Sequence, residues 1–251
     1  MEMEFFSICL GLFLISILYS SVGHGGASGY LAVLSLSVYG GMGNSWLKQY
    51  AWCLNLFVAA IAFYHYYKAG YFNKKLSLPF IIGSVPFAII GGFLRIDGII
   101  YDSLLSITLI WAAYKLYQTK KDEGEIKNKI PNLKVSIPTG AGIGFASGII
   151  GVGGGIFLSP IILLKKWADP KTVAATSALF IWINSLGGLF GAGISNQLNI
   201  DLDILLPFIL VVLMGGYLGS KFGSKSNNSI IKSLLIIVLL IAALKRFLEY
   251  L

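Results

Sequence analysis

Charged side chains are scarce in this sequence, since Asp, Glu, Lys and Arg make up only 12% of its 251 residues while 56% of the residues are hydrophobic. An ordinary soluble domain carries about 25% charged residues, so this composition excludes a soluble globular protein. Lipid-facing strands of a barrel would alternate apolar and polar residues, and the apolar runs here do not. About 20 apolar residues cross a bilayer core as a helix. The sequence therefore predicts an all-α polytopic membrane protein.

Cysteines and membrane-embedded acids are also few. Cys9 and Cys53 lie in apolar runs without metal-ligand spacing, which predicts buried thiols and gives no reason to expect a metal or cofactor. No Asp or Glu falls in the interior of a predicted span, since Asp102 and Asp203 sit at span ends, which excludes a carboxylate relay for cations and favours an anionic substrate. The 19 Lys and Arg residues are scattered through connecting segments, so they indicate membrane topology rather than a nucleic-acid partner.

The chain divides into two similar halves. Four short patterns recur in the same order 124 to 130 residues later, among them Gly23–Gly26 at Gly151–Gly154 and Asn55 at Asn184. The one clearly polar stretch, at 118–135, lies near the middle of the chain. We predict a first transmembrane repeat at 1–117, a polar linker at 118–135 and a second repeat at 136–251. The apolar runs on which this division rests are 5–22, 27–42, 46–67, 77–94, 99–117, 136–150, 155–164, 172–191, 203–220 and 230–248.

The Lys and Arg distribution favours one path through the membrane. If eight units each cross once, the two sides carry 11 and 8 basic residues, which gives no bias. If the glycine-rich breaks turn the chain back, so that 5–42 and 136–164 each begin and end on one side, the split becomes 15 to 4. The positive-inside rule then predicts two inverted four-unit repeats, about eight transmembrane helical units in all, with broken or re-entrant helices at the midplane. Both termini are expected outside and the linker in the cytoplasm, although Lys245 and Arg246 oppose this orientation.

Glycine clusters at matching positions of the two halves indicate a binding site. Four glycines fall within 23–29 and four within 151–155, and each destabilises a helix by about 1 kcal/mol relative to alanine. Paired breaks of this kind indicate a transport site, and helices that restart after a break present N–H groups that attract anions. The alternative is close helix packing through glycine. The expected substrate-binding residues are Ser20, Ser21, Gly23, His24, Gly25, Gly26, Ser28, Asn55, Ser147, Gly151, Gly153, Gly154, Gly155 and Asn184.

Three polar side chains of this set have two interpretations each. His24 is the one titratable group in either break, with Val152 as its counterpart, and it either binds an anion or proton or bonds a nearby carbonyl as a neutral ring. Asn55 and Asn184 occupy equivalent places on the helix after each break. Each amide either contacts the substrate or only joins neighbouring helices.

The second break, Gly148-Ile149-Ile150-Gly151-Val152-Gly153-Gly154-Gly155-Ile156-Phe157-Leu158-Ser159-Pro160, resembles the TauE/SafE sulfite exporter family. The resemblance extends over the whole chain through the duplicate around Gly23-His24-Gly25-Gly26, the two four-segment halves and the polar linker. The first break departs from the pattern, with His24 inside it and Ala32 where Pro160 would align. The resemblance implies a secondary transporter that exports sulfite, organosulfonates or related small organic anions across the bacterial inner membrane.

Two other classes of function stay open. Gly26-Ala27-Ser28-Gly29 has the GxSG pattern of rhomboid-like intramembrane serine proteases, with Ser28 as nucleophile and His24 or His65 as base. The position of Ser28 early in the chain and the closeness of His24 in sequence argue against this enzyme. A membrane assembly protein that transports nothing is the other alternative, but it leaves the paired helix breaks without a purpose.

Overall fold

The computed structural model describes residues 2–94 and 130–248, and all regular structure within them is helical. Five of these helices, α1, α4, α6, α8 and α9, have the length and hydropathy to cross a membrane. The prediction of an all-helical multi-pass membrane protein is therefore confirmed, while the apolar run 99–117 and most of the linker 118–135 lie outside the described residues. The helices are α1 (Glu2–Ser20), α2 (Ala27–Ser35), the 3-10 helix η1 (Val38–Met42), α3 (Asn44–Lys68), α4 (Lys74–Phe93), α6 (Leu133–Ile150), α7 (Gly155–Leu164), α8 (Pro170–Ile194), α9 (Leu202–Lys225) and α10 (Asn228–Leu248).

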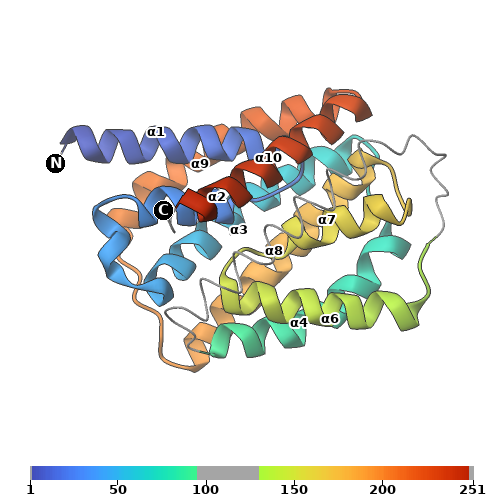
Figure 1. The fold of residues 1–251 in the computed structure, drawn as a ribbon, viewed down its shortest axis with the longest axis horizontal. Coiled ribbons are helices and arrows are strands. Elements are labelled where there is room, and N and C mark those ends of the chain that lie inside the picture. The colour runs from blue at the N-terminus through green and yellow to red at the C-terminus, as the bar shows by residue number, and fades with distance from the viewer. Residues whose placement is uncertain (1, 95–129, 249–251) are drawn as a thin grey trace.

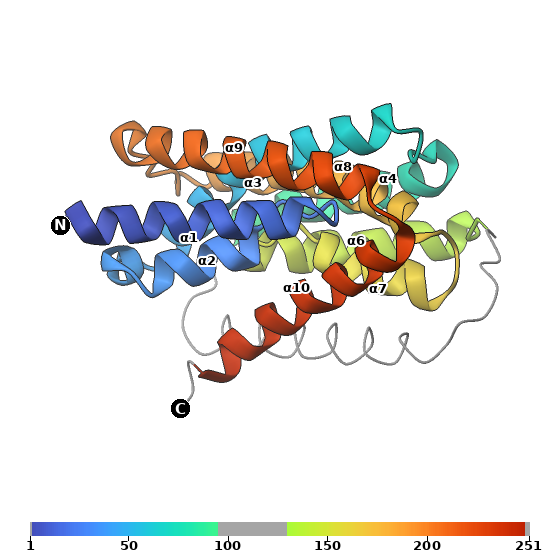
Figure 2. The ribbon, with the colours of Figure 1, turned by 90° about the horizontal axis from the view of Figure 1, so that it is seen from above.

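The chain turns back at both glycine-rich breaks. Figures 1 and 2 show that α1 runs from the N-terminal end of the molecule towards the other end and that α2 returns towards the N-terminal end. α6 starts at the opposite end, and α7 returns to it (Figures 1 and 2). The stretches 5–42 and 136–164 therefore each begin and end at one end of the molecule. α3 and α8, which follow these stretches, run in opposite directions.

The continuous apolar composition of 27–42 suggested one helix, but the structure divides this run into two. α2 ends at Ser35, and η1 begins at Val38 after the side chain of Ser37 accepts a hydrogen bond from the backbone N–H of Tyr39 at 3.2 Å. A serine hydroxyl at this place offers the backbone an alternative to the next helical bond. The result is a half-length helix, about 13 Å long at about 1.5 Å per residue, that begins inside the protein at the first break.

Stripes of glycine let neighbouring helices approach closely. On α6, Gly140, Gly144 and Gly148 face the backbone of α4 between Phe80 and Ala88, where an added Cβ would lie 2.1 to 2.4 Å from a carbonyl oxygen. Such small-residue stripes drive association of membrane helices, because lipid offers no hydrophobic driving force between them. α9 packs on α1 in the same way, through Gly215, Gly219 and Gly223.

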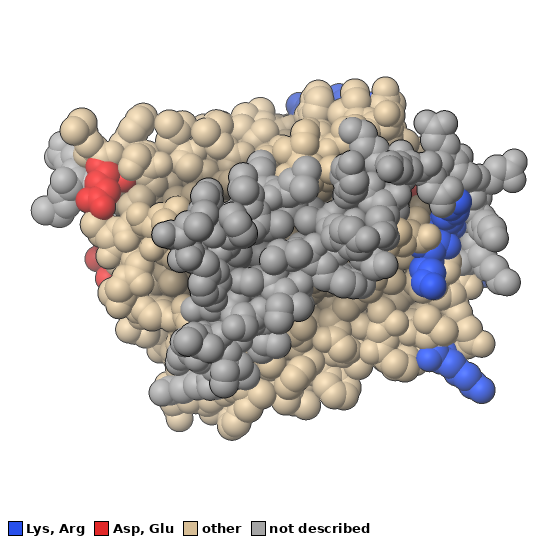
Figure 3. Space-filling model, in the orientation of Figure 1, with Lys and Arg blue, Asp and Glu red and all other residues tan. Residues whose placement is uncertain are grey.

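Charge is divided between the two ends of the molecule. On the face drawn in Figure 3, Asp and Glu gather near the N-terminal end, and Lys and Arg gather at the opposite end. The basic end holds the start of α4 at Lys74, the end of α7 before Lys165 and the end of α9 at Lys225. This division is the one that the positive-inside rule associates with a cytoplasmic and an external side.

Candidate functional site

Both helix breaks are built around glycines in the left-handed region. Gly26 precedes α2 with a φ of 109°, and Gly154 precedes α7 with a φ of 82°. Gly23, Gly151 and Gly153 also have positive φ, between 73° and 88°. A side chain with a Cβ rarely adopts this conformation, whereas glycine does so at little cost. These glycines therefore serve to interrupt the helices, unlike the glycine stripes that pack α6 and α9.

Asn55 of α3 joins the two breaks. Its Oδ1 accepts a hydrogen bond from the N–H of Ala27 at 3.1 Å, which caps the N-terminus of α2, and its Nδ2 donates to Ser185 Oγ on α8 at 3.3 Å. A Cβ added to Gly25 would lie 2.2 Å from Asn55 Oδ1, and one added to Gly153 would lie 2.8 Å from Asn55 Nδ2. The first and second breaks thus lie on either side of one fully buried amide.

His24 reaches from the first break to the second half of the chain. Its Nε2 lies 2.9 Å from Ser159 Oγ on α7, and Ser159 Oγ lies 2.7 Å from Ser177 Oγ on α8. The Ser159 hydroxyl also donates to the carbonyl of Gly155 at 2.9 Å. If Ser159 gives its one hydrogen to Gly155, Nε2 must carry the hydrogen of the histidine bond. The Nδ1 atom then donates to a ligand only when the ring is protonated.

A small cavity lies where the breaks meet. Its volume is about 10 Å³, which is room for about one water molecule. Hydroxyl groups border it, since Ser28 Oγ donates to Tyr19 at 3.0 Å and the Tyr30 hydroxyl donates to the carbonyl of Gly25 at 2.7 Å. The lining residues are Tyr19, His24, Gly25, Gly26, Ala27, Ser28, Val152, Ile156 and Ile181.

Several buried polar atoms around this junction have no hydrogen-bond partner among the described residues. They include His24 Nδ1, Trp52 Nε1, Ser147 Oγ and Asn184 Oδ1. Ser147 packs against Gly154 of the second break, Trp52 precedes Asn55 by one helical turn, and Asn184 is next to Ser185. Buried polar atoms are paired in the great majority of cases, so a group of unpaired atoms at one place indicates a ligand or a second conformation.

The predicted site residues do not all come together. Ser20 and Ser21 donate to carbonyls of their own helix and lie against Gly219 and Gly223 of α9, on the side away from the junction. Asn184 donates through Nδ2 to Phe180 of its own helix at 2.7 Å and does not cap α7 as Asn55 caps α2. The remaining residues of the predicted set lie at the two breaks or on the helix turns that contact them.

The structure adds Ile181 and Ser159 to the site residues that the sequence singled out. Ile181 contacts both breaks, since a Cβ on Gly25, Gly153 or Gly155 would lie 2.4 to 3.1 Å from its side chain. Ser159 and Ser177 extend the hydrogen-bond chain from His24. The internal repeat could have pointed to Ile181. It lies 129 residues after Trp52, and the same 129 residues separate Asn55 from Asn184.

The described residues do not assemble a serine protease at Ser28. Its hydroxyl bonds Tyr19, His24 Nε2 pairs with Ser159, and His65 Nδ1 lies 2.7 Å from Ser220 Oγ on α9. Among the side chains of residues 3–94 and 130–238, no group of three or more His, Cys, Asp or Glu is placed to hold a metal ion.

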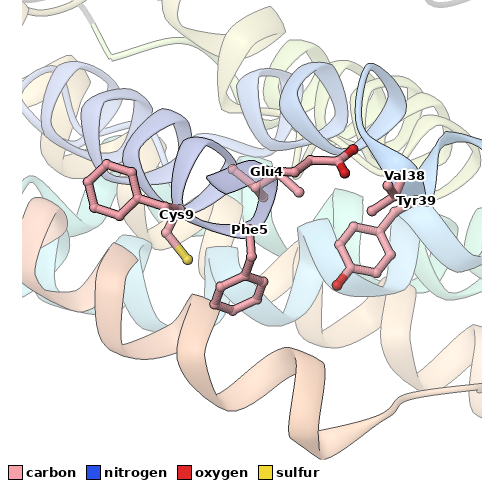
Figure 4. A pocket seen from close by; sticks show the side chains of 7 residues that line it. Glu4, Phe5, Cys9, Val38 and Tyr39 are labelled. Carbon is pink, nitrogen blue, oxygen red and sulfur yellow. The ribbon is translucent and has the colours of Figure 1, made fainter. Parts of the chain in front are cut away.

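A larger apolar pocket of about 430 Å³ lies between the start of α1 and η1 (Figure 4). Phe5, Cys9, Val38 and Tyr39 line it together with Glu4, whose carboxylate disfavours an anion. The junction of the breaks, which holds the buried donors, is therefore the better candidate for an anion site.

Comparison with known proteins places the chain in a family. The family model described as "Sulfite exporter TauE/SafE" matches residues 8–246. The chain belongs to the TauE/SafE family. This TauE/SafE protein is 34% identical over 195 residues to "Probable membrane transporter protein y4hK" of Sinorhizobium fredii, covering 76% of this chain and 78% of that one. It is 32% identical over 186 residues to "Probable membrane transporter protein MJ0441" of Methanocaldococcus jannaschii, with 70% and 68% covered. No solved structure matches the chain.

These relatives confirm the resemblance seen in the glycine-rich motif and establish the class of the protein as a membrane transporter family member. The names of these relatives specify no substrate. The nature of the transported molecule therefore has to be argued from the TauE/SafE chain's own residues at the junction of the breaks.

Proposed function

We propose that this protein is a secondary transporter that exports sulfite, organosulfonates or related small organic anions across the inner membrane. The anion binds between the two helix breaks, close to Asn55. The observation that carries the proposal is the meeting of two broken helices at one buried amide, surrounded by polar atoms that lack partners among the described residues. Trp52 Nε1 and Ser147 Oγ are donors, which suits an anion, and His24 Nδ1 becomes a donor when the ring is protonated.

The ends of the restarted helices support an anionic ligand. α2 and α7 both begin at the junction, and the first N–H groups of a helix have no partners within the helix. The helix dipole adds a partial positive charge at the same place. Within the described residues, the acids Glu4, Asp169, Asp201 and Asp203 lie at or beyond helix starts, away from the breaks.

The cavity at the junction is too small for the proposed substrate. A sulfite ion has four heavy atoms, whereas the space of about 10 Å³ takes about one water molecule. We therefore assign the structure to a closed state, and binding requires the helices around the break to move apart. Transport follows when the site opens alternately to each side of the membrane.

We infer that the two halves are inverted repeats. Support comes from the two breaks, from α3 and α8, which have 25 residues each and run in opposite directions, and from the charge division in Figure 3. The basic end is then cytoplasmic and the N-terminal end external. Within the part of the chain that the structure describes, no observation at this site favours an intramembrane protease or a protein that does not transport.

Thermal stability in detergent tests the proposed function. A ligand that binds only the folded protein raises its stability by RT ln(1 + [L]/Kd), or about 2.7 kcal/mol at 100 times Kd. We expect sulfite or a small sulfonate such as methanesulfonate to raise the melting temperature. The sodium salts of chloride and acetate are the controls. A panel in which no sulfite or sulfonate stabilises the protein more than these controls contradicts the proposal.

A further inference from the structure

Lys48 is a buried basic residue next to the second break. Its side chain is 1% exposed, and it projects from the second turn of α3. A Cβ added to Gly151 would lie 2.7 Å from Lys48 Cγ and 3.0 Å from Lys48 Cβ, so the aliphatic stem of the lysine rests directly on the break. A lysine is almost never so deeply buried without a specific reason. In a membrane protein, an ionisable residue buried beside a helix break indicates a functional site.

The internal duplication gives Lys48 a counterpart at the first break. Asn55 and Asn184 are 129 residues apart, and the same offset places Lys48 opposite Ser177. Ser177 belongs to the hydrogen-bond chain that starts at His24, with Ser159 between them. Thus α8 contributes a hydroxyl to the group at the first break, and α3 contributes an amine to the equivalent place at the second break.

The two groups lie on opposite sides of the junction. Lys48 precedes Asn55 by seven residues and Ser177 precedes Asn184 by seven, which is about 10 Å along each helix at about 1.5 Å per residue and about two full turns. Because α3 and α8 run in opposite directions, Lys48 lies towards the N-terminal end of the molecule and Ser177 towards the basic end. A path that crosses the junction meets His24 on one side and Lys48 on the other.

We propose that Lys48 and the second break form a second binding station for the transported anion, on the side of Asn55 nearer the N-terminus. This inference rests on the proposed function. The first station consists of His24, Ser159 and Ser177, and the anion moves from one station to the other as the site changes the side to which it opens. The ligand class is a small oxyanion, because an ammonium group and the backbone of a glycine-rich break both favour negatively charged oxygen atoms.

Binding and sidedness measurements test the second station. Equilibrium binding of sulfite and of methanesulfonate is measured on purified wild type and on Lys48→Met, Lys48→Arg and Lys171→Met. Lys171 is the matched control, since it is a lysine 8% exposed at the start of α8, away from the breaks, with Nζ bonded to the Tyr71 hydroxyl at 2.9 Å. Lys48→Met is expected to weaken binding about tenfold or more. Lys48→Arg and Lys171→Met are expected to stay within about threefold of the wild type.

Transport from each face separates a binding role from a structural one. In vesicles sorted by orientation, Lys48→Met is expected to raise the half-saturating concentration on the face that exposes the N-terminus more than on the other face. Two results overturn the second station but not the proposed function, provided that the wild type binds sulfite or methanesulfonate. In the first, Lys48→Met binds the anion as tightly as the wild type does. In the second, Lys48→Met raises the half-saturating concentration equally on both faces. Failure of the wild type to bind either anion overturns the proposed function itself. If Lys48→Met does not purify as a monodisperse protein, Lys48→Gln takes its place in both measurements.

Discussion

Replacing Gly25 by alanine tests whether Asn55 holds the two breaks together. A Cβ at this position would lie 2.2 Å from Asn55 Oδ1 and 2.7 Å from Asn55 Cγ. Gly25 is not one of the glycines with positive φ, so alanine fits its backbone and the clash with Asn55 is the main cost. The asparagine must move, and its hydrogen bond to the N–H of Ala27 is lost.

The expected size of the effect follows from that bond. Loss of an N-cap costs about 1 kcal/mol, and a buried N–H left without a partner costs about 1 to 3 kcal/mol. We expect Gly25→Ala to lower the free energy of unfolding by about 2 kcal/mol. Anion binding is expected to fall at least tenfold, or about 1.4 kcal/mol of binding free energy, because the displaced Asn55 lies at the proposed site.

A double-mutant cycle measures this coupling. Thermal stability and sulfite binding are compared for Gly25→Ala, Asn55→Ala and the double variant. Asn55→Ala removes the atoms with which the new methyl group collides, so the double variant is expected to be no less stable than Asn55→Ala alone. Gly142→Ala is the matched control, because a Cβ there has nothing within 4 Å and alanine favours the helix. Additive effects of Gly25→Ala and Asn55→Ala, or equal stability of Gly25→Ala and Gly142→Ala, would refute the reasoning.

Three further predictions concern topology, protonation and access. In a variant without native cysteines, Asn73→Cys is expected to react with a membrane-impermeant thiol reagent only from the cytoplasm and Asn199→Cys only from outside; the reverse pattern rejects the orientation. Sulfonate affinity is expected to fall as pH rises through the range in which histidine loses its proton, and His24→Gln is expected to abolish this dependence; identical pH curves for the two proteins remove the role of His24. Gly153→Leu is expected to leave the protein inserted in the membrane but to stop transport, and normal transport by this variant reduces the second break to a packing feature.

Local signals were sufficient to predict the breaks and the membrane class. Glycine clusters weaken a helix wherever they occur, so residues 23–26 and 151–154 interrupt helices in the structure as their composition indicated. Equivalent positions in the two halves also identified Asn55, which lies between Gly25 and Gly153. These properties depend on a few neighbouring residues and on their repetition, which the sequence displays directly.

Packing between the halves could not be predicted in the same way. Ser159 and Lys48 belong to the junction because of where α7 and α3 lie relative to the breaks. Ser20 was expected in the site because it precedes a break, but the rotation of α1 turns its side chain towards α9. A sequence gives the order of such residues along the helix, whereas the face that meets a neighbour depends on the whole bundle.

Transport of a labelled sulfonate by purified protein in liposomes tests the central claim most directly. The wild type and Gly153→Leu are reconstituted in equal amounts, with liposomes that contain no protein as the background, and uptake of sulfite and of methanesulfonate is followed down an imposed gradient. The account predicts saturable uptake of at least one of these anions by the wild type and background uptake by Gly153→Leu. Background uptake by the wild type, or equal uptake by both proteins, would contradict an anion path between the two helix breaks.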